Sequence, residues 1–330
     1  MLDAAGGQTR LGGSLQSLRR MPFFAEGLFL LAAAAAFFIF PDSLGVLTRM
    51  LVMMIFVLSI DLVLGYAGVA TLGQSALYGA GAYAAGLFAL RVSADPLVGL
   101  LAGACAGAAI ALVSGLMLMR TRGLTLLVMS IAVSQILQEV ANQWRSVTGG
   151  ADGLSLVAAP LLGRFDFDLV GKTAYWYALA VLACVYLVLK ALVAAPLGLS
   201  ARGIRESAAR MAAIGAPVGR RLVTLYVIGG AIAGIAGALS AQITELVSLE
   251  VFSFTLSAEA VLMLVLGGAG RLVGALLGTL VFMSVQHVAA AADPYNWLFV
   301  IGAMILAVVF FLPRGLIGAP EALRRLWSRP

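Results

Sequence analysis

Apolar runs of about twenty residues recur along the chain, and this feature constrains the fold more than any other. The 330 residues are 62% hydrophobic and 11% charged, whereas soluble proteins carry about 25% charged residues. An α-helix needs about 20 apolar residues to cross a hydrocarbon core about 30 Å thick. The runs are apolar on all sides and lack the alternation of membrane β-barrel strands. The predicted fold class is therefore an all-α, polytopic membrane protein.

About ten membrane-spanning helices are expected. They cover residues 23–40, 46–64, 76–90, 96–119, 123–142, 174–193, 221–243, 251–270, 272–291 and 296–312. This divides the chain into an N-terminal tail (1–22), a transmembrane domain (23–312) and a C-terminal tail (313–330). Arginines before the first run also fit a cleaved signal peptide. We favour a retained first span because an even number of spans places both termini on one side.

The basic residues indicate which side that is. All but five of the 21 Lys and Arg residues fall at one set of alternate connecting segments; the five are Arg49, Arg91, Arg145, Arg164 and Lys172. Cytoplasmic loops carry an excess of Lys and Arg, so both termini are predicted to be cytoplasmic. The net charge of +6 is thus explained by orientation signals, and no nucleic acid partner is expected.

Two Gly-rich stretches interrupt the apolar pattern, LGYAGVATLGQS at 64–75 and LGGAGRLVG at 266–274. Irregular backbone at membrane depth must line a cavity or be covered by protein, so we expect broken or re-entrant segments. Paired interruptions in two halves of a transporter often mark the binding region. The candidate residues of a substrate pathway are Gly65, Gly68, Gly73, Gln74, Tyr78, Glu259, Gly267 and Gly268.

Glu259 lies near the middle of the eighth expected span. An ionised side chain at the bilayer centre costs about 3 kcal/mol on insertion scales, so it must face protein or water. Glu259 either forms a structural hydrogen bond or lines the substrate route. Because a proton-coupled carrier needs such a residue, an ion-coupled secondary carrier or channel for a small polar solute is the alternative function.

The segment 199–215, LSARGIRESAARMAAIG, is short, charged and amphipathic between two very apolar spans. On one continuous helix, an apolar side and a charged side would hold, respectively, Ile204, Ala208, Met211 and Gly215, and Arg202, Arg205, Glu206 and Arg210. The predicted topology places this helix on the cytoplasmic side. We expect a partner protein to meet it there.

Patterns for catalysis are nearly absent. His287 is the only histidine, which excludes His-cluster metal sites. Gly171-Lys172-Thr173 ends like a nucleotide-binding loop, but Asp166 stands where that motif requires glycine. We therefore expect a non-enzymatic chain with no metal and no cofactor, and an ATP site on another chain if transport is ATP-driven.

An outer loop combines turn-forming residues, namely Thr148, Gly149, Gly150, Asp152 and Gly153. Glycine supplies positive φ and aspartate caps turns. The loop is either a tight surface turn or a docking or gating loop on the outer face.

Four stretches occur together in this order: DLVLGYAGVATLGQSALYGAGAY (61–83), RGLTLLVMSIAVSQILQEVANQWRSVTGGADGLS (122–155), ARGIRESAARMAAIG (201–215) and FSFTLSAEAVLMLVLGGAGRLVGALLG (252–278). They resemble the permease subunits of branched-chain amino acid ABC importers, in particular the LivM-like member of the permease pair. The resemblance covers roughly residues 45–315.

The resemblance implies a multi-pass protein of the bacterial inner membrane that acts with several partners. These would be a LivH-like second permease, two cytoplasmic ATPase subunits, a periplasmic substrate-binding protein and membrane lipid. The implied substrate is a branched-chain or other hydrophobic amino acid, although relatives also import urea or short amides.

The resemblance also implies that 201–215 is the cytoplasmic coupling helix. Glu206, Ala208, Ala209 and Gly215 stand in for the family's Glu-Ala-Ala and Gly pattern, with one additional residue, Ser207, inside it. The expected ATPase-coupling residues are Arg202, Arg205, Glu206, Ala208, Ala209 and Gly215.

Overall fold

The computed structural model describes residues 33–39, 43–93, 95–121, 123–156, 172–294, 296–311 and 315–316. The chain divides into a short N-terminal unit that ends at Leu44 and a large unit from Gly45 onward. A helix over 33–39 belongs to the first unit. The expected tail 1–22, the first part of the expected span 23–40 and nearly all of 313–330 lie outside the described residues.

The large unit consists almost entirely of helices. In chain order they are α2 (Leu44–Ile60), η2 (Asp61–Tyr66), α3 (Gln74–Arg91), α4 (Pro96–Leu118), α5 (Leu124–Gln143), α6 (Arg145–Thr148), η3 (Gly150–Asp152), α7 (Lys172–Ala194), α8 (Pro196–Ala213), α9 (Val218–Thr244), η4 (Leu249–Phe252), α10 (Phe254–Gly267), α11 (Leu272–Ala292) and α12 (Trp297–Phe311). Two short strands, β1 (Leu154–Ser155) and β2 (Leu246–Val247), pair antiparallel.

Within the described ranges, six helices are long and apolar enough to cross a membrane: Leu44–Tyr66, α4, α5, α7, α9 and α11. The polytopic all-α class is therefore confirmed, but the expected number of about ten spans is not. One reason is the length of α10, whose 14 residues reach only about 21 Å at 1.5 Å per residue. Sequence hydropathy places an eighth span at 251–270, whereas η4 occupies its beginning and the chain leaves the helix after Gly267.

The closest helix packing in the unit is among α3, α4 and α9, which lie backbone against backbone. A Cβ atom on Gly234 of α9 would lie 2.2 Å from the carbonyl oxygen of Gly103 on α4. A Cβ atom on Gly81 of α3 would lie 2.3 Å from the carbonyl oxygen of Gly234. Glycines at four-residue spacing allow such close approach, so these glycines serve packing within the fold.

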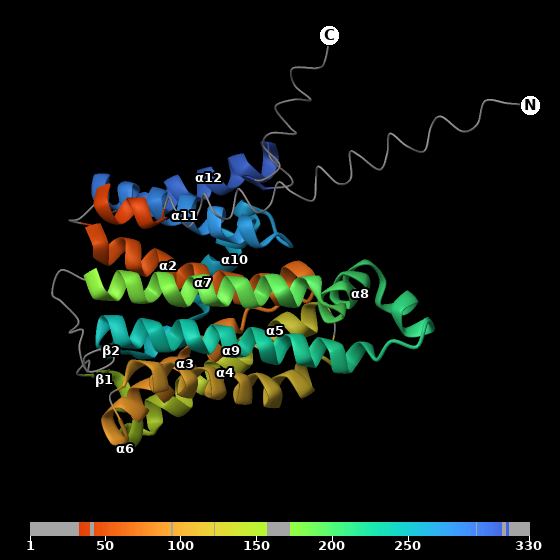
Figure 1. Cartoon of the computed structure of the whole chain (residues 1–330), viewed down its shortest axis with the longest axis horizontal. Coiled ribbons are helices and arrows are strands. Elements are labelled where there is room, and N and C mark those ends of the chain that lie inside the picture. Colours follow the sequence, from red (N-terminus) through yellow and green to blue (C-terminus); the bar gives the residue numbers. More distant parts are fainter. Residues whose placement is uncertain are drawn as a thin grey trace, which may run out of the picture. The chain divides into compact units, whose positions relative to one another are not determined.

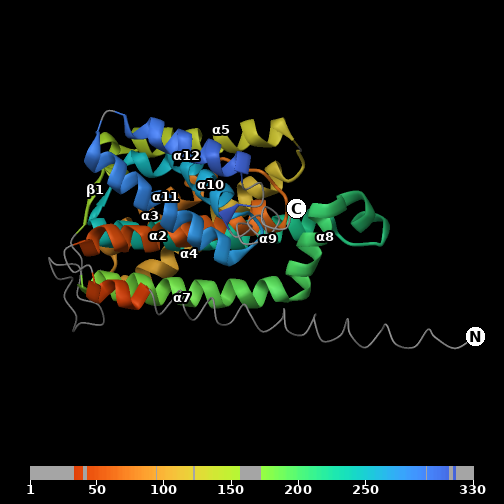
Figure 2. The ribbon, with the colours of Figure 1, turned by 90° about the horizontal axis from the view of Figure 1, so that it is seen from above.

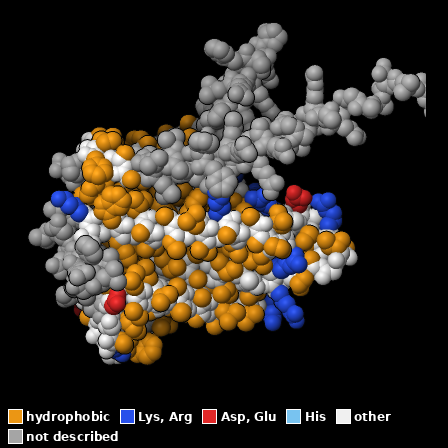
Figure 3. Space-filling model, viewed as in Figure 1, with side chains coloured by type: hydrophobic (Ala, Val, Ile, Leu, Met, Phe, Trp, Pro, Cys, Tyr) orange, Lys and Arg blue, Asp and Glu red, His pale blue; other side chains and the backbone are white. Residues whose placement is uncertain are grey.

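The long helices lie side by side, and the connecting elements gather at their two ends (Figures 1 and 2). The segment α8 lies beyond one end of α7 and α9, whereas α6, β1 and β2 lie at the opposite end. Hydrophobic side chains cover the face seen in Figure 3, and Lys and Arg side chains gather around the α8 end. The charged segment and the outer loop are thus at opposite ends of the bundle.

Candidate functional site

The first Gly-rich interruption is shorter than expected. The helix α2 continues as one π-helical turn, η2, up to Tyr66, and α3 begins at Gln74. The irregular part is therefore residues 67–73, which we call the first break. Gly68 has a φ of +72°, which favours glycine. A π-helical turn is rare and is frequently found at functional sites.

Contacts with α5 hold the end of the first break in place. The backbone N–H of Leu72 donates to the Ser130 hydroxyl oxygen at 3.0 Å. A Cβ atom on Gly73 would lie 2.1 Å from the Ser130 carbonyl oxygen. The expected pathway residue Gly73 is thus needed for close contact between α5 and the start of α3.

The second break, residues 268–271, is also shorter than expected, because Gly267 ends α10 and α11 begins at Leu272. Gly268 and Gly270 have φ values of +107° and +87°, which L side chains adopt at a cost. A Cβ atom on Gly267 would lie 1.9 Å from the carbonyl oxygen of Gly274 on α11. Glycine therefore allows α10 to turn directly onto α11.

The second break meets η2, the π-helical turn directly before the first break, although about 200 residues separate them in the sequence. Asp61 Oδ1 accepts a hydrogen bond from the backbone N–H of Gly270 at 2.7 Å. A Cβ atom on Gly65 would lie 2.5 Å from the same nitrogen atom. A Cβ atom on Gly270 would lie 3.0 Å from the Gly65 carbonyl oxygen. We call this the Gly65–Gly270 contact.

Asp61 is a functional candidate that the sequence analysis missed. Its side chain is 0% exposed, and Oδ2 has no hydrogen-bond partner among the described residues. The guanidinium charges of Arg205 and Arg202 act on its carboxylate. The cost of an acidic side chain inside an apolar span, which drew attention to Glu259, applies equally to Asp61 within the expected span 46–64.

The segment α8 is not the single continuous helix that its helical wheel assumes. Ser207 has a φ of −163° and a ψ of 100°, so two helical pieces meet there at a kink. Residues before Ser207 and residues after it therefore do not share the helix faces that one continuous helical wheel would give them. The inserted residue of the Glu-Ser-Ala-Ala stretch is the one that leaves the helix.

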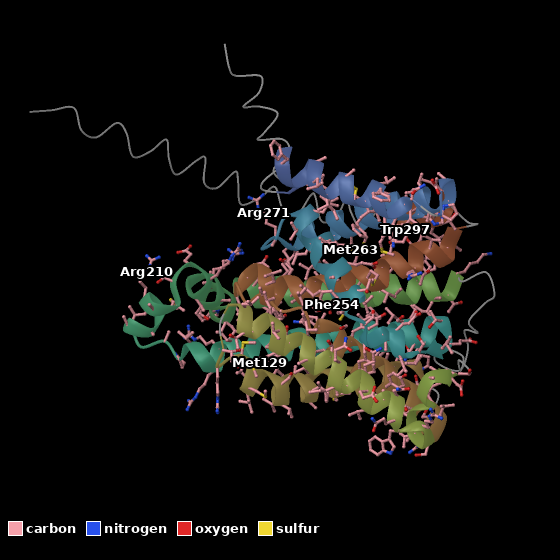
Figure 4. The ribbon with its side chains drawn as sticks, turned by 180° about the vertical axis from the view of Figure 1, so that it is seen from behind. Met129, Arg210, Phe254, Met263, Arg271 and Trp297 are labelled. Atoms are coloured by element: carbon pink, nitrogen blue, oxygen red, sulfur yellow. The ribbon has the colours of Figure 1, made fainter. Side chains whose placement is uncertain are left out.

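The two pieces of α8 have different surroundings. In the first piece Ile204 is buried, Arg202 lies 5.1 Å from the centre of the Tyr66 ring, and the Arg205 guanidinium donates to the Gly65 carbonyl oxygen. Figure 4 shows Arg210, in the second piece, out on α8 beyond the bundle. The first piece therefore contacts the membrane domain, and the second is available to a partner.

The remaining coupling candidates lie around the kink and at the end of α8. Glu206 and Ala209 are exposed, and Ala208 is half-buried. Gly215 has a φ of +84° and nothing within 4 Å of an added Cβ atom. The neighbouring Ala216 N–H donates to the Met211 carbonyl oxygen at 3.0 Å, as in a glycine-terminated helix end.

A cavity of about 450 Å³ lies between the first break and α8. Most of its lining is apolar, and it includes Gly68, Val69, Leu126, Ile204, Ala208 and Leu222, together with Arg205. The cavity borders both pieces of α8, because Ile204 precedes the kink and Ala208 follows it.

Gln74 and its neighbours form a buried polar group at the start of α3. Gln74 is 0% exposed, and its Oε1 atom has no partner within the described part of the chain. The next residue, Ser75, connects to α10, since its N–H donates to the Ser257 hydroxyl at 2.8 Å and its hydroxyl donates to the Phe252 carbonyl at 3.1 Å. Figure 4 labels Phe254 at the beginning of α10.

Tyr78 and Glu259 are not joined to Gln74 by any hydrogen bond that the described residues form. Tyr78 is 4% exposed, and its ring lies 4.9 Å from that of Phe56. Glu259 is half-buried on α10. Tyr78 and Glu259 lie on α3 and α10, two helices that meet through the hydrogen bond from the Ser75 N–H to Ser257.

The outer loop folds as a series of tight turns. The Thr148 hydroxyl donates to the Ala141 and Trp144 carbonyl oxygens, and accepts from the Gly150 N–H at 3.3 Å. A Cβ atom on Gly149, whose φ is +74°, would lie 2.0 Å from the Gly153 carbonyl oxygen. Asp152 is exposed at the end of η3. This geometry explains the residue types, and a docking role stays a prediction.

Among the residues that the structure covers, no three His, Cys, Asp or Glu side chains are grouped so that they could hold a metal ion. The groups described at this site are packed helices, backbone carbonyl oxygens and a few buried polar side chains.

The family and the relatives that this chain matches are branched-chain amino acid transport permeases. Residues 43–309 match the family described as "Branched-chain amino acid transport system / permease component". The high-affinity branched-chain amino acid transport system permease protein LivM of Escherichia coli is 26% identical over 325 residues, which cover 90% of this chain and 75% of LivM. LivH of the same organism is 27% identical over 126 residues, which cover 38% of this chain and 41% of LivH. No solved structure matches the chain.

Proposed function

The chain belongs to the family of branched-chain amino acid transport permease components, and from this premise we propose the pathway, partners and substrate that follow. It is a membrane subunit of an ABC importer and lines the transport pathway together with a second, LivH-like permease. Its substrate is a branched-chain or other hydrophobic amino acid. The chain itself performs no catalysis, and two cytoplasmic ATPase subunits supply the energy.

One observation carries this proposal: α8 contacts the broken segments with its first piece and extends beyond the bundle with its second. A segment in this position can pass a movement from a partner to the breaks. Glu206, Ala208, Ala209 and Gly215 are the proposed residues for the ATPase contact.

The proposed orientation places α8 and both termini in the cytoplasm. It is supported by the Lys and Arg side chains that gather around α8, since cytoplasmic loops are enriched in these residues. The outer loop at 148–153 then faces the periplasm, where a substrate-binding protein would dock. The pathway candidates Gln74, Tyr78 and Glu259 lie between these two ends.

The proposal is tested by reconstituting the chain in vesicles with a LivH-like second permease, the ATPase subunits and a substrate-binding protein. Uptake of radiolabelled leucine and ATP hydrolysis are measured together. Glu206→Arg reverses an exposed charge, and Gly215→Pro forces a φ of about −65° where the chain has +84°. Both variants should insert normally but take up little leucine for each ATP hydrolysed.

Gly302→Ala is the control, because an added methyl group on this residue of α12 meets nothing within 4 Å. It should retain the uptake of the original chain. Normal uptake by both Glu206→Arg and Gly215→Pro would contradict the proposed coupling role of α8.

The alternative, an ion-coupled carrier or channel, is favoured by Glu259 and by the pair of Gly-rich breaks. It predicts that the purified chain transports solute under a proton or sodium gradient without any ATPase. Vesicles that contain only this chain and the second permease distinguish the two functions, because the ABC importer should be inactive in them.

A further inference from the structure

We propose that Arg205 is a positioning residue that transmits the displacement of α8 to both Gly-rich breaks, with Asp61 as the buried charge that keeps the breaks together. The inference rests on the proposed function, since it assumes that α8 is displaced by an ATPase. It assigns Arg205 to the membrane domain rather than to the ATPase surface.

One side chain reaches both breaks. The Arg205 guanidinium donates to the Gly65 carbonyl oxygen at the edge of the first break. A Cβ atom on Gly270, in the second break, would lie 2.6 Å from Arg205 Nη1. Arg205 therefore lies directly over the Gly65–Gly270 contact.

The aliphatic part of Arg205 also contacts the first break. A Cβ atom on Gly68 would lie 2.8 Å from Arg205 Cγ and 3.2 Å from Arg205 Cβ. Gly68 therefore has no side chain at the point where the aliphatic part of Arg205 passes. A shift of α8 cannot leave the first break unaffected, because stem and guanidinium contact it at two separate points.

Asp61 links the second break to this contact. Its Oδ1 atom accepts a hydrogen bond from the Gly270 N–H at 2.7 Å, and a Cβ atom on Gly65 would lie 1.8 Å from the same oxygen atom. A displacement of Gly65 by Arg205 therefore also displaces the Asp61 side chain and the Gly270 backbone, so the two breaks respond together rather than separately.

The structure also leaves room for the movement. The helix α8 is interrupted at Ser207, two residues after Arg205. The cavity of about 450 Å³ borders Gly68, Ile204, Arg205 and Ala208. The piece that carries Arg205 therefore has open space beside it as well as a kink that separates it from the second piece.

The test uses the complete complex in vesicles and measures leucine uptake and ATP hydrolysis in the same sample. Arg205→Met keeps the aliphatic stem but removes the donor and the charge. We expect uptake per ATP hydrolysed to fall about fivefold or more, the lower end of typical coupling factors, while hydrolysis continues. Arg205→Lys, which retains a charged donor, should restore part of the ratio.

Arg91→Met is the matched control, since it removes the same charge from an exposed position at the end of α3, outside α8. Its uptake per ATP should be that of the original chain. An unchanged ratio in Arg205→Met would overturn the inference. A proportional loss of uptake and hydrolysis would also overturn it, because that result indicates an ATPase contact.

If Arg205→Met does not assemble, Arg205→Lys and Asp61→Asn carry the test. Asp61→Asn keeps an oxygen for the Gly270 N–H and removes the charge, so its uptake per ATP should also fall. Failure of all three variants to assemble would mean that both residues serve only the fold, which overturns the inference. The proposed function is tested separately, because its failure would be seen as absent ATP-driven uptake in the original complex.

Discussion

Gly65→Ala probes the contact between the two breaks with the addition of one methyl group. The new Cβ atom would lie 1.8 Å from Asp61 Oδ1 and 2.5 Å from the Gly270 nitrogen. Both distances are far shorter than van der Waals contact. The Asp61 carboxylate can rotate away, but the Gly270 backbone can move only with the whole second break.

The expected loss of stability has two parts. Overpacking of a filled site costs about 1–3 kcal/mol. Loss of the hydrogen bond from the Gly270 N–H to the Asp61 carboxylate adds about 1.5–3 kcal/mol, the range for bonds to charged groups. The variant should therefore be about 3–6 kcal/mol less stable, and its uptake should fall.

The assay compares thermal unfolding of the detergent-solubilised complex with leucine uptake in vesicles. Gly45→Ala is the matched control on α2, because an added Cβ atom there has nothing within 4 Å. If Gly65→Ala unfolds at the same temperature as Gly45→Ala and takes up leucine normally, the Gly65–Gly270 contact does not hold the breaks together.

Thr148→Val should destabilise the outer loop by about 1–3 kcal/mol, because the Ala141 carbonyl and the Gly150 N–H lose a buried partner. Proteolysis of the loop in intact vesicles measures this, and unchanged cleavage would contradict it. If Glu259 lines the pathway, Glu259→Gln should raise the leucine concentration that gives half-maximal uptake. If that concentration is unchanged and the thermal stability is lower, Glu259 has a structural role instead.

The positions of the helices were predictable from the sequence, because apolar runs show where a helix lies and Gly or Pro residues show where it begins or ends. The expected span 96–119 and α4 (Pro96–Leu118) nearly coincide, since Asp95 and Pro96 are strong signals for a helix start. The number of spans was less predictable. Hydropathy alone does not show that η4 takes up the beginning of the expected span 251–270.

The candidate site was predictable only in part, because its contacts join distant segments. Both interruptions were evident from their glycines, but the contact of Gly65 with Gly270 joins residues about 200 positions apart, which no local pattern predicts. The extra residue Ser207 was evident in the motif, but the kink there was not predicted, because a helical wheel treats the segment as continuous. The resemblance placed Arg205 among the residues expected to meet the ATPase, and that role stays a prediction.

The packing of α3, α4 and α9 limits how a transport cycle can proceed. Where backbone lies directly against backbone, as at Gly103 and Gly234, no side-chain torsion is available to absorb a sliding motion. We therefore expect these three helices to move as one rigid body. Rotation between inward-open and outward-open states would then occur at hinges around that body, and we propose residues 67–73 and 268–271, which border Arg205 of α8 at Gly68 and Gly270, as these hinges.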